Sequence, residues 1–205
     1  MRKIRIMAMI VAMTLCISAL AGCRKKPSAV AQNDEIALSG DTKVLVVYFS
    51  WSGNLQKMSH WIAEETGGDI IRVLASDPYP EDYDETADRA KKEKDEGIRP
   101  AITIDLTAEE IAKYDTIFLG FPVWWYDLPM PMWTFLESVD LEGKTVIPFF
   151  SHEGSSTGAS SLDTIKRLAE GADVKTDDAL SIRGGKVAGS EETVRNWVRD
   201  LGYGK

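Results

Sequence analysis

The stretch KVLVVYFSWSGN, residues 43–54, decides the fold. After Lys43 it runs as an unbroken apolar segment to Phe49, as expected for a strand that is covered on both faces of a sheet. Its last five residues lead directly into apolar residues at helical spacing over Asn54–Glu65. The stretch therefore predicts a strand, a tight loop and a helix, the first half of a unit that joins two parallel strands.

Strand and helix patterns alternate along the rest of the chain. Further strands are predicted at Asp69–Leu74, Thr116–Phe121, Lys144–Phe150 and Asp173–Ile182. Between them lie helical patterns: a charged segment at Asp77–Pro100, a capping box at Thr107–Glu110, a helix with Pro131 in its first turn, a helix over Ser161–Glu170 and a last helix capped by Ser190. The alternation implies an α/β fold with a five-stranded parallel sheet and helices on both faces.

The first 23 residues have the pattern of an export signal. Three basic residues lie within the first five positions, a short apolar run spans Ile6–Ala19, and the sequence LAGC ends at Cys23. This ending resembles a bacterial lipobox, in which the cysteine is lipidated. We therefore expect a lipoprotein signal peptide at 1–22, lipidation at Cys23, a flexible tether at 23–42 and a folded domain at 43–205. The alternative is an N-terminal anchor helix.

Composition excludes several classes of protein. The chain has 205 residues, is 44% hydrophobic and has a net charge of −8, which suits one or two globular domains rather than a disordered chain. No apolar span of about 20 residues follows residue 30, so a multi-span membrane protein is excluded. Without residues 1–22, 21 basic residues face 32 acidic ones, so nucleic acid is not an expected partner. Two histidines and no cysteine after Cys23 predict no metal site.

Ligands of a parallel α/β sheet bind at the carboxyl ends of its strands, so the loops there should carry the chemistry. The first loop contains Ser50, Trp51, Ser52, Gly53 and Asn54 just before a helix. Hydroxyls, a glycine and the free N–H groups of a helix N-terminus suit a phosphate. A polar turn with a good helix cap is the alternative.

Two more loops carry candidate ligand-binding residues. The second loop contains three consecutive aromatic residues, and its members are Pro122, Val123, Trp124, Trp125 and Tyr126. Three neighbouring aromatic rings cannot all face a core, so at least one should be exposed as a stacking surface for a flat ring system. The third loop contains Ser151, His152, Glu153 and Gly154. There the histidine either donates a hydrogen bond to a ligand or caps the loop.

Together these loops resemble the flavodoxin-like family, and within it the bacterial proteins with a YFS-x-[ST]-G-N first loop and a G-[FY]-P-[IV]-W-W second loop. The corresponding segments here are YFSWSGN at 48–54 and GFPVWW at 120–125. The resemblance implies the strand order 2-1-3-4-5 and noncovalent FMN binding. The first loop would hold the phosphate, and the second and third would line the isoalloxazine. One departure is Leu55, where the family usually has threonine, so one hydroxyl donor to the phosphate is lost.

The resemblance implies a redox function with three alternatives. The first is an FMN protein that carries electrons between redox partners and is anchored by lipid at the extracytoplasmic face of a bacterial membrane. Its partner would be a redox protein or a small-molecule electron acceptor. The second is a flavin-dependent NAD(P)H:quinone-type reductase, and the third is a binding protein that keeps the fold but has lost FMN. Covalent attachment of FMN at the sequence STGASS, residues 156–161, is a further possibility, although a helix cap also explains that sequence.

Overall fold

The computed structural model of the chain describes residues 43–205. The predicted signal peptide at 1–22, the lipidation site Cys23 and the tether at 23–42 lie outside these described residues. Within 43–205, no helix is both long and apolar enough to cross a bilayer.

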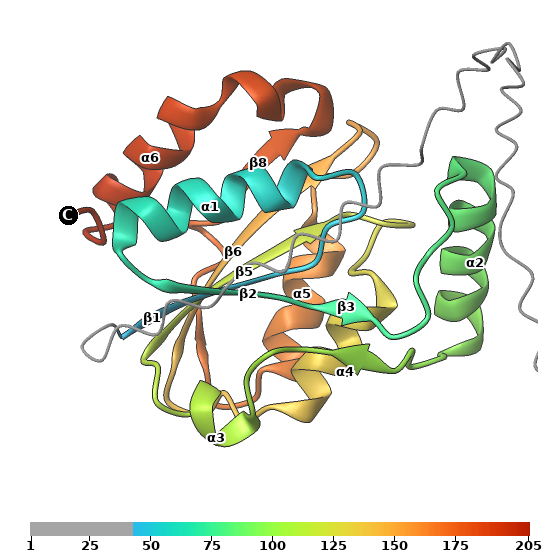
Figure 1. The fold of residues 1–205 in the computed structure, drawn as a ribbon, viewed down its shortest axis with the longest axis horizontal. Helices are drawn as coiled ribbons and strands as arrows, with labels where there is room; N and C mark the ends of the chain where they lie inside the picture. The colour runs from blue at the N-terminus through green and yellow to red at the C-terminus, as the bar shows by residue number, and fades with distance from the viewer. Residues whose placement is uncertain (1–42) are drawn as a thin grey trace, which may run out of the picture. The chain divides into compact units, whose positions relative to one another are not determined.

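A parallel sheet forms the centre of the described domain (Figure 1). Its strands are β1 (Val44–Tyr48), β2 (Asp69–Arg72), β5 (Thr116–Pro122), β6 (Thr145–His152), β7 (Asp173–Val174) and β8 (Leu180–Arg183), in the order β2-β1-β5-β6-β7 with β8 also paired to β6. Every pairing in this sheet is parallel. The predicted α/β class and order are confirmed, because β5 and β6 are the third and fourth strands of the prediction.

The predicted fifth strand is wrong in one respect, because Asp173–Ile182 is divided between β7 and β8. Both segments pair with β6, one with its start and the other with its end. On β6 the carbonyl of Val146 faces β7, where it accepts a hydrogen bond from the Lys175 amide at 2.9 Å. Two residues further along, Pro148 faces the same side and has no N–H to donate. The ladder is therefore interrupted where the proline lies.

Helices cover both faces of the sheet (Figure 1). Helices α1 (Asn54–Thr66) and α6 (Glu191–Asp200) lie on one face with a 3-10 helix, η1 (Gly184–Gly189), and the opposite face carries α3 (Ala108–Ile111), α4 (Met130–Ser138) and α5 (Ala159–Leu168). Each layer encloses its own cluster of buried side chains. On the first face Met58 and Val194 pack around Phe118, and on the second Phe135 and Ile165 pack around Leu119. The unbroken apolar strands of the sequence follow from this double covering.

The helix ends agree with the sequence at three positions and differ in one side-chain bond, at Ser190. Thr107 and Glu110 form both bonds of the predicted capping box, and Pro131 lies in the first turn of α4. Ser190 stands at the N-cap of α6, but its hydroxyl donates to the Val187 carbonyl at 2.8 Å and caps nothing. Helix α5 starts at Ala159 behind Gly158, which has a φ of 76° and brings no side-chain cap. The helix cap expected within 156–161 is therefore confirmed in its position, and glycine rather than a hydroxyl residue provides it.

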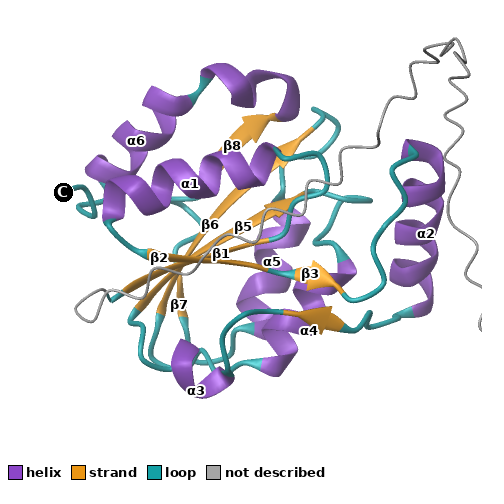
Figure 2. Cartoon of the chain, in the orientation of Figure 1, coloured by secondary structure: helices purple, strands orange, loops and turns teal. Residues whose placement is uncertain are grey.

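A separate excursion leaves the sheet between β2 and β5. The predicted strand Asp69–Leu74 divides into β2 and β3 (Leu74–Ala75), and β3 pairs antiparallel with β4 (Ile102–Thr103), a strand that the sequence analysis missed. The charged segment between them contains α2 (Tyr83–Glu96), which stands beyond the end of the sheet (Figure 2). Asp82 caps this helix by accepting a hydrogen bond from the Glu85 amide at 3.0 Å.

Candidate functional site

The first loop presents an uncapped helix N-terminus. Gly53 is the N-cap of α1 with a φ of 84°, and no side chain caps the helix. Ser50 Oγ fixes the loop by accepting a hydrogen bond from the Gly53 amide at 3.1 Å. A Cβ built on Gly53 meets no atom within 4 Å, so the space in front of the helix is open. Free N–H groups of the first turn and the positive end of the helix dipole therefore face a space that an anion can enter.

Leu55 contributes to this loop only through its backbone. Its side chain is 1% exposed and belongs to the core cluster that contains Met58 and Phe118. The prediction of Leu55 as a cofactor-binding residue is therefore limited to the amide, because the isobutyl group packs under the sheet-facing side of α1.

The second loop is a tight hairpin with two strained aromatic residues at its tip. Trp124 and Asp127 exchange backbone hydrogen bonds at 2.9 Å in each direction. Between them Trp125 and Tyr126 have φ values of 47° and 66°, the left-handed region that costs a non-glycine residue about 1–2 kcal/mol. The same two side chains are 40% and 59% exposed. Strain of this kind persists where the surroundings fix it, and such sites are often functional.

The two tryptophans of this loop have different environments. Trp124 packs edge-on against Phe49 and Tyr79, with ring centroids 5.4 and 5.1 Å away. Trp125 instead donates its indole N–H to the Ala87 carbonyl of α2 at 2.9 Å, and the ammonium of Lys91 lies 5.6 Å from its ring. The expectation that at least one of the three aromatic residues would be exposed is met by Trp125 and Tyr126.

The third loop brings polar groups toward the first loop. His152 ends β6, and its Nδ1 atom is buried with no hydrogen-bond partner among the described residues. A Cβ built on Gly184 of η1 would collide with the Glu153 carboxylate and lie 3.0 Å from the Asn54 amide nitrogen. Gly184 therefore allows Glu153 and Asn54, which come from different loops, to approach the same point.

The three loops surround a cavity of about 310 Å³. Eleven of the predicted residues line it: Trp51, Ser52, Asn54, Pro122, Val123, Trp124, Trp125, Tyr126, Ser151, His152 and Glu153. Ser50, Gly53, Leu55 and Gly154 are not among the lining residues, although the first two shape the loop. The volume lies in the range of small-molecule and cofactor sites.

Sequence reasoning missed the contribution of α2. Four of its residues, Tyr83, Thr86, Ala87 and Ala90, line the same cavity. The charged pattern of the segment favoured a solvated helix, and most of α2 is indeed exposed. A usable signal was present, because Thr86, Ala87 and Ala90 are small residues on one face of an otherwise charged helix. Small residues there allow α2 to approach the second loop.

Comparison with known proteins agrees with this architecture. The family model described as flavodoxin matches residues 43–201. Provisionally assigned flavoproteins from Bacteroides uniformis ATCC 8492 and Bacteroides eggerthii DSM 20697 are 32% and 30% identical to the chain, with TM-scores of 0.65 and 0.64. The alignments cover 77% and 79% of this chain and 98% and 99% of those chains. A search of curated proteins gives no match.

A third solved structure is a flavoprotein from Lactobacillus acidophilus NCFM in complex with FMN. It is 25% identical, with a TM-score of 0.56, and the alignment covers 74% of this chain and 99% of that one. The family match extends over nearly all the described residues, and the relatives are covered almost from end to end. The chain therefore belongs to the flavodoxin family.

Proposed function

We propose that this protein binds one FMN noncovalently in the cavity between its three loops and carries electrons between redox partners. The observation that carries the proposal is the uncapped N-terminus of α1 beside a cavity lined by aromatic side chains. The phosphate would lie at the amides of the first loop, and the isoalloxazine between the second and third loops. The FMN complex of the related Lactobacillus flavoprotein supports the choice of cofactor.

The residues present fit this cofactor at both of its ends. The first loop offers free backbone donors and an open space, as a phosphate requires. At the other end, the unpartnered Nδ1 of His152 lies on the loop that would flank the ring system. Exposed rings at Trp125 and Tyr126 offer a stacking surface whose strained backbone is already in place.

Bound flavin supplies one- and two-electron chemistry, and the protein controls its potential and its access. The carboxylate of Glu153 would place negative charge beside the ring and disfavour its reduced, anionic form. Helix α2 closes one side of the cavity, and a partner would approach past Tyr126. The processed chain, with 21 basic and 32 acidic residues and so a net charge of 21 − 32 = −11, favours a basic redox partner.

The location is part of the same proposal. The basic and apolar pattern of residues 1–22 and the cysteine at position 23 support lipid anchoring at the extracytoplasmic face of a bacterial membrane. Labelling of cells with a palmitate analogue tests it. The wild-type chain should be labelled and recovered in the membrane fraction, whereas Cys23→Ala should carry no label. A labelled Cys23→Ala chain would contradict lipidation at this residue.

Cofactor binding is tested by fluorescence titration with FMN and, as a matched ligand, riboflavin, which lacks the phosphate. A soluble form that starts at Arg24 keeps every strand and both core clusters that the structure describes within residues 43–205. We expect saturable quenching at one FMN per chain and weaker binding of riboflavin. Asn54→Asp adds one negative charge to the first loop and should weaken FMN about tenfold while changing riboflavin little.

The control for that variant is Asn196→Asp, the same change on the exposed side of α6. It should bind FMN as the wild type does. Equal effects of the two variants, or equal affinities for FMN and riboflavin, would contradict a phosphate site at the first loop. No saturable quenching by a folded protein would refute FMN binding altogether.

A further inference from the structure

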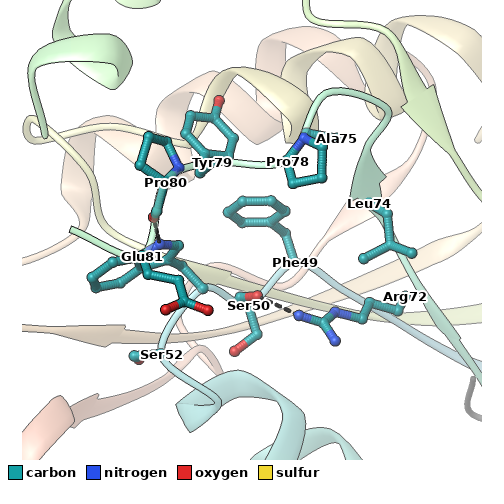
Figure 3. Close-up of a pocket in the computed structure, with 11 residues that line it drawn as sticks. Phe49, Ser50, Ser52, Arg72, Leu74, Ala75, Pro78, Tyr79, Pro80 and Glu81 are labelled. Carbon is teal, nitrogen blue, oxygen red and sulfur yellow. Dashed lines mark hydrogen bonds between the residues drawn. The ribbon is translucent and has the colours of Figure 1, made fainter. Parts of the chain in front are cut away.

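A second cavity, of about 450 Å³, lies on the other side of the first loop. It is enclosed by the end of β1 and its loop, by the β2–β3 segment and by residues 78–81 that precede α2 (Figure 3). It shares Trp51 and Ser52 with the flavin cavity but includes no residue of the second or third loop. The two cavities are therefore neighbours that are separated by the first loop.

One wall of this cavity is apolar. Phe49 and Tyr79 pack edge to face with ring centroids 6.0 Å apart, and Leu74 is 43% exposed beside them. The Tyr79 hydroxyl is not available to a ligand because it donates a hydrogen bond to the Glu93 carboxylate. Burial and this hydrogen bond raise the pKa of Tyr79 well above its ordinary value, so the side chain stays neutral. The wall therefore suits an apolar or aromatic group.

Arg72 adds a positively charged side chain to the lining of this cavity. It ends β2, is half-buried, and donates one hydrogen bond from Nη2 to the Ser50 carbonyl at 2.8 Å (Figure 3). Its Nε atom is buried and has no acceptor among the described residues.

The absence of an ion pair is unusual for a half-buried arginine in this acidic chain. The other two half-buried arginines of the described part, Arg89 and Arg195, each pair with carboxylates. Of the four exposed arginines there, Arg99 and Arg199 form such pairs, whereas Arg167 and Arg183 do not. Arg72 makes no such pair among residues 43–205. A guanidinium with unused donors beside a cavity is a good receptor for a carboxylate, because it offers fixed parallel N–H groups.

We propose that this cavity binds a small organic monocarboxylate with an apolar or aromatic body. The carboxylate pairs with Arg72, and the body lies against Phe49, Leu74 and Tyr79. Glu81 on the cavity lining adds negative charge, which favours a monoanion over a more highly charged ligand. The site does not depend on FMN binding. It is nevertheless adjacent to the phosphate loop, because Arg72 holds the carbonyl of Ser50, whose hydroxyl holds the Gly53 amide.

The test is a ¹H–¹⁵N NMR titration of the soluble form with 3-phenylpropionate, followed at the Arg72 Nε–H and Trp51 Nε1–H signals. The Arg72 signal is assigned by its loss in Arg72→Gln. The neutral amide of the same acid, 3-phenylpropionamide, is the matched ligand. We expect saturable shifts of both signals with the acid, and binding of the amide that is weaker by about tenfold or more.

Two variants complete the experiment. Arg72→Gln should weaken the acid by about tenfold or more, whereas Arg167→Gln removes the same charge from α5 and should not change the affinity. The titration is repeated in saturating FMN, which should leave the shifts in place. Equal binding of acid and amide, no shift at Arg72, or displacement of the acid by FMN would each overturn the proposal. Failure of FMN to bind would leave these readouts unaffected.

Discussion

Leu55 allows a sharp test of where the phosphate binds. It is the second residue of α1 and is almost completely buried. The Cα–Cβ bond of a helical residue tilts toward the helix N-terminus, so a hydroxyl on Cβ at this position would lie near the proposed phosphate. Leu55→Thr adds that hydroxyl, and Leu55→Val is its control with nearly the same shape. Comparison of the two variants isolates the hydroxyl from the loss of core packing.

The magnitudes follow from burial. Leu55→Val removes one buried methylene, which with the cavity left behind costs about 1–1.5 kcal/mol of unfolding free energy. Without ligand, Leu55→Thr should be less stable than Leu55→Val by about a further 1–3 kcal/mol, because its hydroxyl replaces a buried methyl group. A hydrogen bond from the hydroxyl to the charged phosphate is worth about 1.5–3 kcal/mol, so Leu55→Thr should bind FMN about 10–150-fold more tightly than Leu55→Val.

Urea unfolding gives the stabilities, and fluorescence titration gives the affinities. Riboflavin should not distinguish the two variants, because it has no phosphate. Equal FMN affinities for Leu55→Thr and Leu55→Val, with both variants folded, would refute the placement of the phosphate at the start of α1. A preference for Leu55→Thr with riboflavin as well would show that the hydroxyl acts elsewhere in the cavity.

Three further outcomes are expected from the described contacts. Trp125→Asn should destabilise the protein by about 2 kcal/mol more than Tyr126→Asn in urea unfolding. Both changes relieve similar backbone strain, but only the Trp125 side chain contacts α2. Equal losses would contradict a role of Trp125 in holding α2 in place. Glu153→Gln should raise the midpoint potential of bound FMN by tens of millivolts in a redox titration, and an unchanged potential would place the carboxylate away from the ring. The hydrogen bond from Arg199 lowers the pKa of Glu65, so this pair stabilises the fold above the ordinary glutamate pKa, and the stability is lost as the pH falls through the lowered value. Arg199→Gln should therefore lower the free energy of unfolding at pH 7 in urea unfolding, and this loss should shrink as the pH falls below the ordinary glutamate pKa; a loss that is independent of pH would refute the ion-pair account.

The sequence determined most of the fold through patterns that are local. Apolar strands and amphipathic helices alternate clearly, and the capping box at Thr107 is formed as predicted. The errors arose where a distant partner decides the structure. Pro148 interrupts the ladder of a neighbouring strand, and Ile102–Thr103 is a strand only because it pairs with Leu74–Ala75. Neither effect is visible in the segment that it changes.

The candidate site was predictable to the extent that it lies on loops at strand ends. Eleven of the predicted residues line one cavity, because the carboxyl ends of parallel strands meet at one edge. The contribution of α2 was not predicted, because a helix with so many charged residues is normally exposed to solvent and does not line a binding site. For Leu55, the sequence did not show that its side chain is buried in the core, so that only its backbone amide is left to face the cavity side of the loop.

The excursion that contains α2 has a consequence for how such proteins diversify. It leaves through β3 and returns through β4, which pair side by side, and the Ser76 amide closes its base by donating to the Ala101 carbonyl at 2.8 Å. The two ends of the segment 76–101 thus lie side by side, so the segment is a module attached to the domain at one place. Because both ends are held at this one base, a change of length within the segment need not shift the strands beside it. The part of the cavity that α2 lines can therefore change its selectivity while the loops at the strand ends stay as they are.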